Sequence, residues 1–519
     1  MKEWEEERKA LYGYGENKRI TDGDFDASLA VKCVNGTFVG RKTDTIIAYK
    51  GIPFVGRQPV GDLRWKAPVE FTADDGVYEA FYNGKSACQN KFYDEDDDLY
   101  NQGEDCLYLD IWKADDAPAE KKPVLVWVHG GAFEAGGTAS PLFECHNIVK
   151  ENPEIIVVSI AYRLGVFGFF HLSHLPGGEE YPDAQNLGLM DQMMALKWVH
   201  ENIAGFGGDP ESVTIGGESA GAGSVTLLPL IEGSHAYFNR VLSESGFPSF
   251  TRSSRQAIEC TDELMAKLGC ETLDDLRKLD ADTLVEASRV ISLRVSPERD
   301  GNYLPLDPYG EYAKGAAKDI DFLMGCMKNE FDYFPLIMGE EAFARWAEDL
   351  KEEKLARLTE EERDLVLGFC RDAGADPCAQ VCRLMEQSWF NAPLIRLAEN
   401  QTMAGGRVFT YFFTAEPGHG EELVAVFDHQ ELNGEEGRVY DETFAKTMRK
   451  KWVQFIRTGD PSLSAEMSAD GKAKTWPLYD LCSKQIMIFD EFDIHPEKVE
   501  DRKIVDWDRT YFLTKYFWL

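Results

Sequence analysis

The sequence predicts an α/β fold, in which a mostly parallel sheet carries helices on both faces. Short, unbroken apolar runs such as Val124–Val128 recur along the chain, and this pattern is typical of strands buried on both faces. Between them lie longer segments with apolar residues at helical spacing, such as 189–203. No linker rich in Pro, Gly or Ser divides the chain, so we expect one domain over residues 1–519.

The regular alternation of strands and helices begins at residue 124. Buried strands are expected at 124–128, 155–160, 213–215, 240–242, 322–324 and 408–412. Helices are expected at 189–203, from Ala220 onward and at 441–457. Two charged, helical stretches, 251–320 and 336–405, interrupt this order, and we expect them to lie over the strand ends as cap insertions.

The composition limits the possible partners. The chain has 55 basic and 91 acidic residues, which gives a formal net charge of −36. Nucleic acids and anionic membrane surfaces are bound through stripes of Lys and Arg, so neither is expected as a partner. Apolar residues make up 44% of the chain, enough for a large core, which excludes global disorder.

The start of the chain and its cysteines suggest a compartment. Residues 1–8 are charged where a secretory leader would be apolar, and the apolar run 155–170 is interrupted by Arg163. Eleven cysteines cannot all pair within one molecule, and scattered thiols are typical of a reducing environment. We therefore expect a cytoplasmic protein.

Two cysteine pairs were considered as metal ligands. Cys378 and Cys382 lie four residues apart on an expected helix, and Cys88 and Cys106 flank an acidic loop. Neither pair has a second ligand pair at zinc spacing, so buried thiols are the better interpretation. The sequence predicts no metal site.

The sharpest local pattern is the G-x-S-x-G segment Gly217–Gly221, directly after the expected strand 213–215 and before a helix. In this context the pattern predicts a nucleophile elbow, in which Ser219 lies on a tight turn at the carboxyl end of the sheet. Small neighbours are needed there because the chain folds back on itself. The alternative is a glycine-rich turn with an incidental serine.

A second segment, His129–Phe133, follows the strand 124–128 and is rich in small residues. Hydrolysis of an ester needs N–H donors directed at the negative oxygen of the tetrahedral intermediate. The backbone amides of Gly131, Ala132 and Ala220 are the candidate donors. The alternative is a plain turn at the end of a strand.

A serine hydroxyl needs a base, and His419 is the preferred candidate among nine histidines. It follows the strand 408–412 and lies between Gly418 and Gly420. In serine hydrolases of the α/β type the histidine comes last in the chain, which agrees with this position. His429 and His495 fit the order but lack the strand and glycine context.

The acid of such a triad is expected between residues 219 and 419, at the end of a strand. The strand 322–324 is the convincing candidate, and both Glu330 and Asp332 follow it. The residue pattern alone does not separate the two.

Taken together, the chain resembles the type-B carboxylesterases, the group that includes para-nitrobenzyl esterases, liver carboxylesterases and cholinesterases. The resemblance covers about residues 30 to 515 and rests on ordered blocks, among them Gly51–Phe54, Leu63–Trp65, Glu104–Leu109, Tyr162–Gly165, Asn186–Leu189, Phe206–Pro210, Gly217–Gly221, Gly459–Pro461 and Trp476–Tyr479. It implies the α/β-hydrolase fold, a Ser-Glu-His triad and no cofactor.

The resemblance also implies roles for individual residues. The segment Lys328–Phe331 aligns with the family's acid loop and favours Glu330 over Asp332, although Phe331 replaces a glycine there. His419–Leu423 matches the family's histidine segment closely. Ala132 replaces the third glycine of the oxyanion turn but keeps its N–H.

Two further positions match residues that support the family's triad through hydrogen bonds, Glu218 and Ser245. Extracellular relatives carry a disulfide that corresponds to Cys88 with Cys106 and a second one that starts near Cys270. The expected partner of Cys270 is missing here, and the state of the first pair is open.

The function predicted is hydrolysis of small to medium carboxylic esters through an acyl-enzyme. A lipase, thioesterase or amidase on the same fold is the main alternative, because selectivity depends on pockets built by the insertions. The aromatic stretch 331–334 either lines such a pocket or belongs to the core. A non-catalytic, cholinesterase-like binding protein is the other alternative, but its relatives lack the serine or the histidine.

Overall fold

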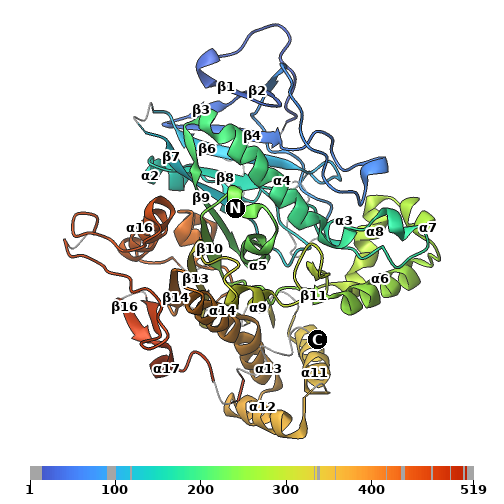
Figure 1. The fold of residues 1–519 in the computed structure, drawn as a ribbon, viewed down its shortest axis with the longest axis vertical. Coiled ribbons are helices and arrows are strands. Elements are labelled where there is room, and N and C mark those ends of the chain that lie inside the picture. The colour runs from blue at the N-terminus through green and yellow to red at the C-terminus, as the bar shows by residue number, and fades with distance from the viewer. Residues whose placement is uncertain are drawn as a thin grey trace.

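The computed structural model describes residues 15–90, 101–116, 120–331, 334–335, 339–356, 358–415, 418–433, 439–468, 471–490, 493–506 and 509–510. Within these ranges the chain forms one large sheet with helices on both faces and further helices at the periphery (Figure 1).

The central sheet has eleven strands in the described ranges, in the order β16-β15-β14-β13-β10-β9-β7-β8-β6-β4-β3. Its parallel centre consists of β7 (Lys122–Val128), β8 (Ile156–Ile160), β9 (Gly208–Glu218), β10 (Arg240–Glu244), β13 (Asp321–Met327), β14 (Val408–Phe413) and β15 (Gln485–Asp490). Antiparallel strands extend it at both ends: β3 (Arg41–Thr43), β4 (Ile46–Pro53), β6 (Tyr108–Ala114) and β16 (Asp493–Lys498).

All six strands expected from apolar runs lie in this parallel centre, and the mostly parallel sheet is confirmed. The third is much longer than expected, because β9 includes the polar segment Gly208–Ser212, whose first residue pairs with Lys122. The antiparallel strands at the two ends of the sheet were not predicted from the sequence.

Side chains of the sheet alternate between two cores. Val124, Val126 and Val128 belong to one buried cluster, whereas Leu125 and Trp127 belong to the other. A strand whose two faces are both apolar therefore carries helices on both sides, as the unbroken apolar run predicts.

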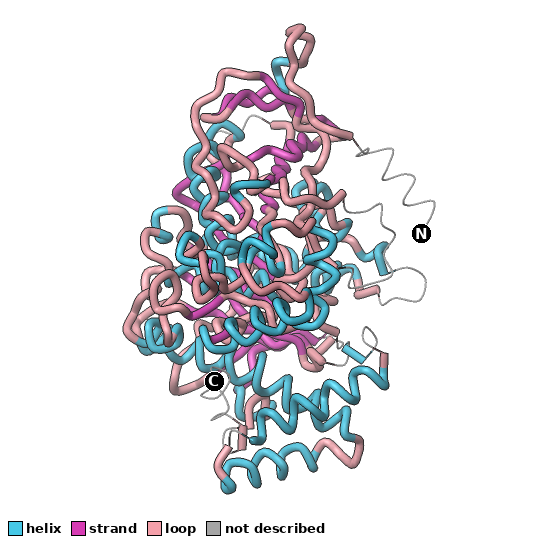
Figure 2. Tube along the Cα trace, turned by 90° about the vertical axis from the view of Figure 1, so that its right-hand side faces the viewer, coloured by secondary structure: helices cyan, strands magenta, loops and turns pink. Residues whose placement is uncertain are grey.

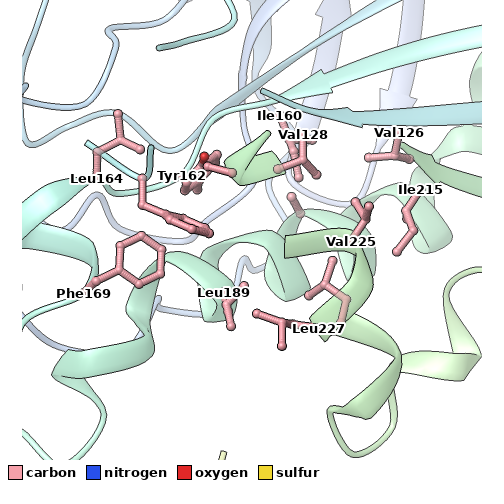
Figure 3. Packing of buried hydrophobic residues seen from close by; sticks show 14 of the residues in the cluster. Val126, Val128, Ile160, Tyr162, Leu164, Phe169, Leu189, Ile215, Val225 and Leu227 are labelled. Atoms are coloured by element: carbon pink, nitrogen blue, oxygen red, sulfur yellow. The ribbon is translucent and has the colours of Figure 1, made fainter. Parts of the chain in front are cut away.

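The first core lies beneath α4 (Leu187–Asn202), α5 (Ala220–Leu227) and α14 (Ala392–Met403). In Figure 3, Val126, Val128 and Ile160 of the sheet lie near Leu189 of α4 and Val225 of α5. The second core is covered by α2 (His146–Glu151), α15 (Leu423–Val426) and α16 (Glu442–Thr458).

In the stretch 251–320, α6 (Ser254–Leu268), α7 (Leu273–Arg277) and α8 (Ala281–Ala287) form a helical group at one side of the sheet (Figure 1). The stretch also contains a small parallel pair, β11 (Arg252–Ser253) and β12 (Glu298–Arg299), and α9 (Pro308–Ala313), which packs against α14.

The stretch 336–405 has two parts. Helices α11 (Glu340–Ala356), α12 (Glu360–Asp372) and α13 (Pro377–Met385) form a group at the lower end of the molecule (Figure 2). They include a small core of their own, made by Leu358, Val366, Phe369, Cys370 and Leu384. A π-helical segment, Glu386–Asn391, leads from there to α14, which packs on the sheet.

Smaller elements complete the described part: a sheet of β1 (Ala30–Cys33), β2 (Gly36–Val39) and β5 (Val77–Glu79), and the short helices α3 (Gly165–Gly168) and α17 (Val499–Arg502). None of the helices within the described ranges has the length and apolar character needed to cross a membrane.

None of the eleven cysteines, all of which lie within the described ranges, forms a disulfide, and this includes Cys88 and Cys106. Both of these side chains are buried, and burial raises the pKa of the Cys88 thiol to about 12. Across the described ranges, no group of three or more His, Cys, Asp or Glu side chains is arranged to hold a metal ion.

Candidate active site

Ser219 lies on a sharp turn between β9 and α5. Its backbone has φ 54° and ψ −120°, a conformation that is rarely adopted by residues other than glycine. The Ser219 amide donates to the Glu244 carbonyl oxygen at 2.9 Å, which anchors the turn to β10. Gly221 is required two residues further along, because a Cβ there would overlap the carbonyl oxygen of Val128.

Three predicted residues form a continuous hydrogen-bonded line. Nε2 of His419 lies 2.7 Å from Oγ of Ser219, and Nδ1 lies 2.6 Å from Oε2 of Glu330. The Glu330 side chain is fully buried, and its Oε1 accepts the Met327 amide at 2.7 Å. When Nδ1 of His419 carries the proton and donates it in a hydrogen bond to Glu330, Nε2 is unprotonated and can accept the hydroxyl proton of Ser219.

The topology explains how these residues meet. Ser219 follows β9, Glu330 follows β13, and His419 lies on the loop after β14. The three strands run parallel with β10 between the first two, so their carboxyl ends lie along one edge of the sheet.

The rejected alternatives lie elsewhere. His429 contacts the Glu144 carbonyl oxygen and Glu431, and His495 is paired with Asp493 at 3.1 Å. Asp332 lies outside the described residues.

The segment 130–136 forms a tight turn beside Ser219. Gly131, Ala132 and Phe133 have φ angles of 107°, 54° and 62°, and the Gly131 carbonyl accepts the amides of Glu134 and Ala135 at 2.9 Å. This backbone reverses the usual direction of the peptide groups. In the described part of the chain, the amides of Gly131 and Ala132 donate no hydrogen bond to another protein group.

Ala220 is the first residue of α5, where an amide has no partner within the helix. Its N–H therefore lies at a helix N-terminus, next to Ser219, where the helix dipole favours negative charge.

The two predicted supporting residues differ in their contacts. Oε1 of Glu218 lies 3.2 Å from Nε2 of His419, and the carboxylate also borders Gly130 and Gly420, where any side chain would crowd it. Ser245 has φ 56° and is buried, but its hydroxyl makes no hydrogen bond to any residue that the structure describes.

The carboxylates determine the charge state of the imidazole. Burial opposes protonation of His419, but the carboxylates of Glu218 and Glu330 outweigh it and raise its pKa to about 9. Burial raises the pKa of Glu218 to about 7, while His419 acts in the opposite direction. The site therefore stabilises the imidazolium that forms when His419 takes a proton.

Two buried acids near the triad were missed by the sequence analysis. Glu244 ends β10 and accepts the indole N–H of Trp452 at 2.9 Å, and burial raises its pKa to about 8. Glu422 is buried three residues after His419, and its pKa is well above the usual range for the same reason. Burial therefore favours the neutral form of both acids, and a neutral acid adds no negative charge around His419. The sequence did hold a signal for their burial: Glu244 ends an apolar strand, and Glu422 lies in the segment 419–423 that matches the family.

Aromatic rings surround the imidazole. Phe390 and Phe334 have ring centroids 5.4 and 6.4 Å from that of His419. Phe331 is fully buried and packs against Phe334 and Trp389, so this part of the 331–334 stretch belongs to the core.

Comparisons with known proteins agree with this architecture. The model of the carboxylesterase family matches residues 27–502. The chain is 32% identical over 504 residues to the para-nitrobenzyl esterase of Bacillus subtilis (strain 168), covering 90% of this chain and 97% of that protein. It is 29% identical over 492 residues to a liver carboxylesterase of Sus scrofa, covering 84% of each.

Solved structures give the same result. The carboxylesterase EST55 of Geobacillus stearothermophilus matches with a TM-score of 0.80 at 31% identity, covering 92% of this chain and 99% of that one. A PNB esterase matches with a TM-score of 0.77 at 29% identity, covering 92% and 100%. The fold is the α/β-hydrolase fold, and the chain belongs to the carboxylesterase family.

Proposed function

We propose that the protein is a serine carboxylic-ester hydrolase in which Ser219 is the nucleophile, His419 the general base and Glu330 the acid that orients the imidazole. The observation that carries the proposal is the line of two short hydrogen bonds, 2.7 Å from Ser219 to His419 and 2.6 Å from His419 to Glu330. This connectivity is what a neutral hydroxyl needs in order to attack a carbonyl carbon.

The reaction proceeds in two halves. His419 takes the proton of Ser219 as Oγ bonds to the ester carbonyl carbon, and the same proton then passes to the departing alcohol. In the second half, His419 takes a proton from water as the water oxygen attacks the acyl carbon. The bond from that carbon to Oγ then breaks, the proton passes from His419 to Oγ, and the carboxylic acid leaves. Glu330 and Glu218 stabilise the imidazolium in both halves, in line with the raised pKa of His419.

The negative oxygen of each tetrahedral intermediate is bound by the amides of Gly131, Ala132 and Ala220. Their support is geometric, since the inverted turn at 131–132 and the start of α5 both border Ser219. Loss of one donor of this kind typically costs about 10²–10³ in rate. No metal ion or organic cofactor takes part in this mechanism.

The substrates proposed are small to medium esters. We also propose that residues 1–519 form a single domain in which 251–320 and 336–405 act as caps that shape the acyl and alcohol pockets. The helical groups in these stretches support this division.

The test is hydrolysis of p-nitrophenyl acetate by the wild type and by Ser219→Ala. We expect the variant to lose at least about 10⁴-fold in kcat/KM with an unchanged thermal midpoint, because the nucleophile is removed without changing the fold. A folded Ser219→Ala protein with wild-type activity would exclude the proposal. The same assay with one anilide and one thioester measures the selectivity for the ester bond.

A further inference from the structure

The turn at 131–133 is connected to a distant part of the chain through the next side chain, Glu134. Its Oε2 accepts the hydroxyl of Ser292 at 2.8 Å, and its Oε1 accepts the amide of Leu293 at 2.8 Å. These partners follow Glu134 by more than 150 residues and lie at the end of the short helix Ser288–Ile291, within the 251–320 insertion.

The turn depends on such external contacts. Ala132 and Phe133 both have positive φ angles, and residues with side chains hold this conformation only where the surroundings fix it. Gly165 donates to the Phe133 carbonyl oxygen at 2.7 Å, and the Gln89 side chain makes two hydrogen bonds of 2.8 Å to the backbone of Gly136. Glu134 lies between Phe133 and Gly136, and its hydrogen bonds to Ser292 and Leu293 add a third external contact to this turn.

The segment that receives Glu134 is itself held in place. Leu293 has φ 62°, and the neighbouring Ile291 is fully buried. Arg252 donates to the carbonyl oxygens of Phe169 and Arg294, and so links the residue after Leu293 to the segment that follows α3. The carboxylate therefore joins two backbone segments of unusual conformation, each with its own support.

Glu134 is buried, so its carboxylate needs hydrogen-bond donors from the protein in place of water. Glu134 is only 9% exposed. Burial raises its pKa to about 7, while the hydroxyl of Ser292, the amides of Leu293 and Val295 and the charge of Arg252 act in the opposite direction. A carboxylate without these donors would not be held in such a buried position.

We propose that Glu134 is a positioning residue for ester hydrolysis, which fixes the oxyanion donors Gly131 and Ala132 by tying their turn to Ser292 and Leu293 of the insertion. The inference rests on the proposed function. It gives the 251–320 insertion a role in the chemical step, in addition to shaping a pocket.

The competing interpretation is a purely structural tie between the insertion and the sheet. Such a tie would lower the thermal midpoint when broken but would leave the chemistry of the folded enzyme unchanged. A ligand that uses the oxyanion donors separates the two interpretations.

A short-chain alkyl trifluoromethyl ketone is such a ligand. Oγ of Ser219 bonds to the ketone carbon, the proton passes to His419, and the carbonyl electron pair becomes an alkoxide that binds the oxyanion donors. Its inhibition constant therefore reports the position of these amides. Acylation and deacylation use the same donors, so a displaced donor slows both steps and leaves KM for p-nitrophenyl acetate near its wild-type value.

The experiment compares Glu134→Ala, Glu134→Gln, Ser292→Ala and the double variant Glu134→Ala/Ser292→Ala. We expect Glu134→Ala to lower kcat and ketone affinity in parallel, by about tenfold, with KM within about twofold of wild type. Glu134→Gln is expected to retain most of both, because its amide accepts from Leu293 and donates to the Ser292 hydroxyl. Ser292→Ala should lose less than Glu134→Ala, and the two changes should not add.

Asp300→Ala is the matched control. Asp300 lies in the same insertion and accepts the backbone amides of Asn302, Tyr303 and Leu304 and the side-chain amides of Gln185 and Asn186. Among the described residues, it makes no hydrogen bond to the turn at 131–133. We expect it to lower the thermal midpoint and to leave the kcat and the ketone affinity of the folded enzyme unchanged.

The inference is overturned if folded Glu134→Ala keeps wild-type kcat and ketone affinity, or if Asp300→Ala loses as much of both. Should Glu134→Ala not fold, Ser292→Ala decides: a parallel loss supports the tie, and wild-type values overturn it. Failure of the proposed function is distinct, because it would appear as full activity in Ser219→Ala.

Discussion

His419 lies between two carboxylates that contact different nitrogens of its ring. Glu330 is bonded to Nδ1, and Glu218 lies 3.2 Å from Nε2, the nitrogen that also meets Ser219. Both charges favour the imidazolium, and together they overcome burial to hold the pKa of His419 at about 9. The raised pKa makes His419 a stronger base for the hydroxyl proton, but it also means that a smaller fraction of His419 is neutral at pH 7.

This arrangement predicts the pH dependence of the reaction. His419 accepts a proton only when neutral, so kcat/KM should rise from pH 7 to about 9 and level off above it. Glu218→Gln removes one charge that favours the imidazolium, and we expect the midpoint of this rise to move to lower pH by about one unit. The measurement is kcat/KM for p-nitrophenyl acetate between pH 5 and 10.

The control is Glu70→Gln, which removes an exposed carboxylate that is paired with Lys197 and is not among the groups that shift the pKa of His419. Its profile should coincide with that of the wild type. An unchanged midpoint in Glu218→Gln, or a shift to higher pH, would show that Glu218 does not act on His419.

At the same scale, the sequence identified Ser219 and His419 because each lies in a short pattern with a physical cause. The residue pattern alone did not separate Glu330 from Asp332, because both acids follow the same strand, and only the family resemblance favoured Glu330. Glu244 and Glu422 were missed because a buried acid looks like a solvated one until burial is known.

At the scale of elements, the elbow between β9 and α5 depends on glycines that allow close backbone approach. A Cβ at Gly221 would overlap the Val128 carbonyl oxygen, so the start of α5 would have to move away from β7. Because Ser219 and the Ala220 amide are attached to that helix, the move displaces both the proposed nucleophile and a proposed oxyanion donor.

We therefore expect Gly221→Ala to lower the free energy of unfolding by about 1–3 kcal/mol and kcat by about 10²-fold. Thermal unfolding and steady-state kinetics measure the two effects. Gly368→Ala in α12 is the matched control, because a Cβ there meets only the end of the Arg371 side chain at 3.6 Å. It should stabilise the helix by up to about 1 kcal/mol without changing kcat. Wild-type kcat and stability in Gly221→Ala would contradict this view of the elbow.

The elements that could be predicted are those with a simple burial pattern. The parallel strands have two apolar faces and appear in the sequence as unbroken apolar runs. The strand β16, whose residues are mostly exposed or half-buried, has no such run. The polar start of β9 was also missed, because its pairing with Lys122 depends on backbone hydrogen bonds and not on side-chain character.

At the scale of the whole molecule, the fold brings together residues that are far apart in the chain. His419 and Ser219 are separated by 200 residues, and His419 and Glu330 by 89. The predicted parallel sheet explains this meeting, because loops that follow parallel strands lie at one edge. The contact between Glu134 and Ser292 was beyond sequence reasoning, since neither residue belongs to a pattern and the insertion's path over the sheet is set by packing.

The central claim is that this edge of the sheet performs acyl transfer through Ser219, and trapping the acyl-enzyme tests it most directly. Wild-type protein is mixed with p-nitrophenyl acetate, quenched in acid within the first turnover and digested for mass spectrometry. We expect an acetyl group on the peptide that contains Ser219, a matching burst of p-nitrophenol, and neither in Ser219→Ala. Rapid hydrolysis with the acetyl group on a different residue, or with no covalent adduct and no burst, would contradict the account.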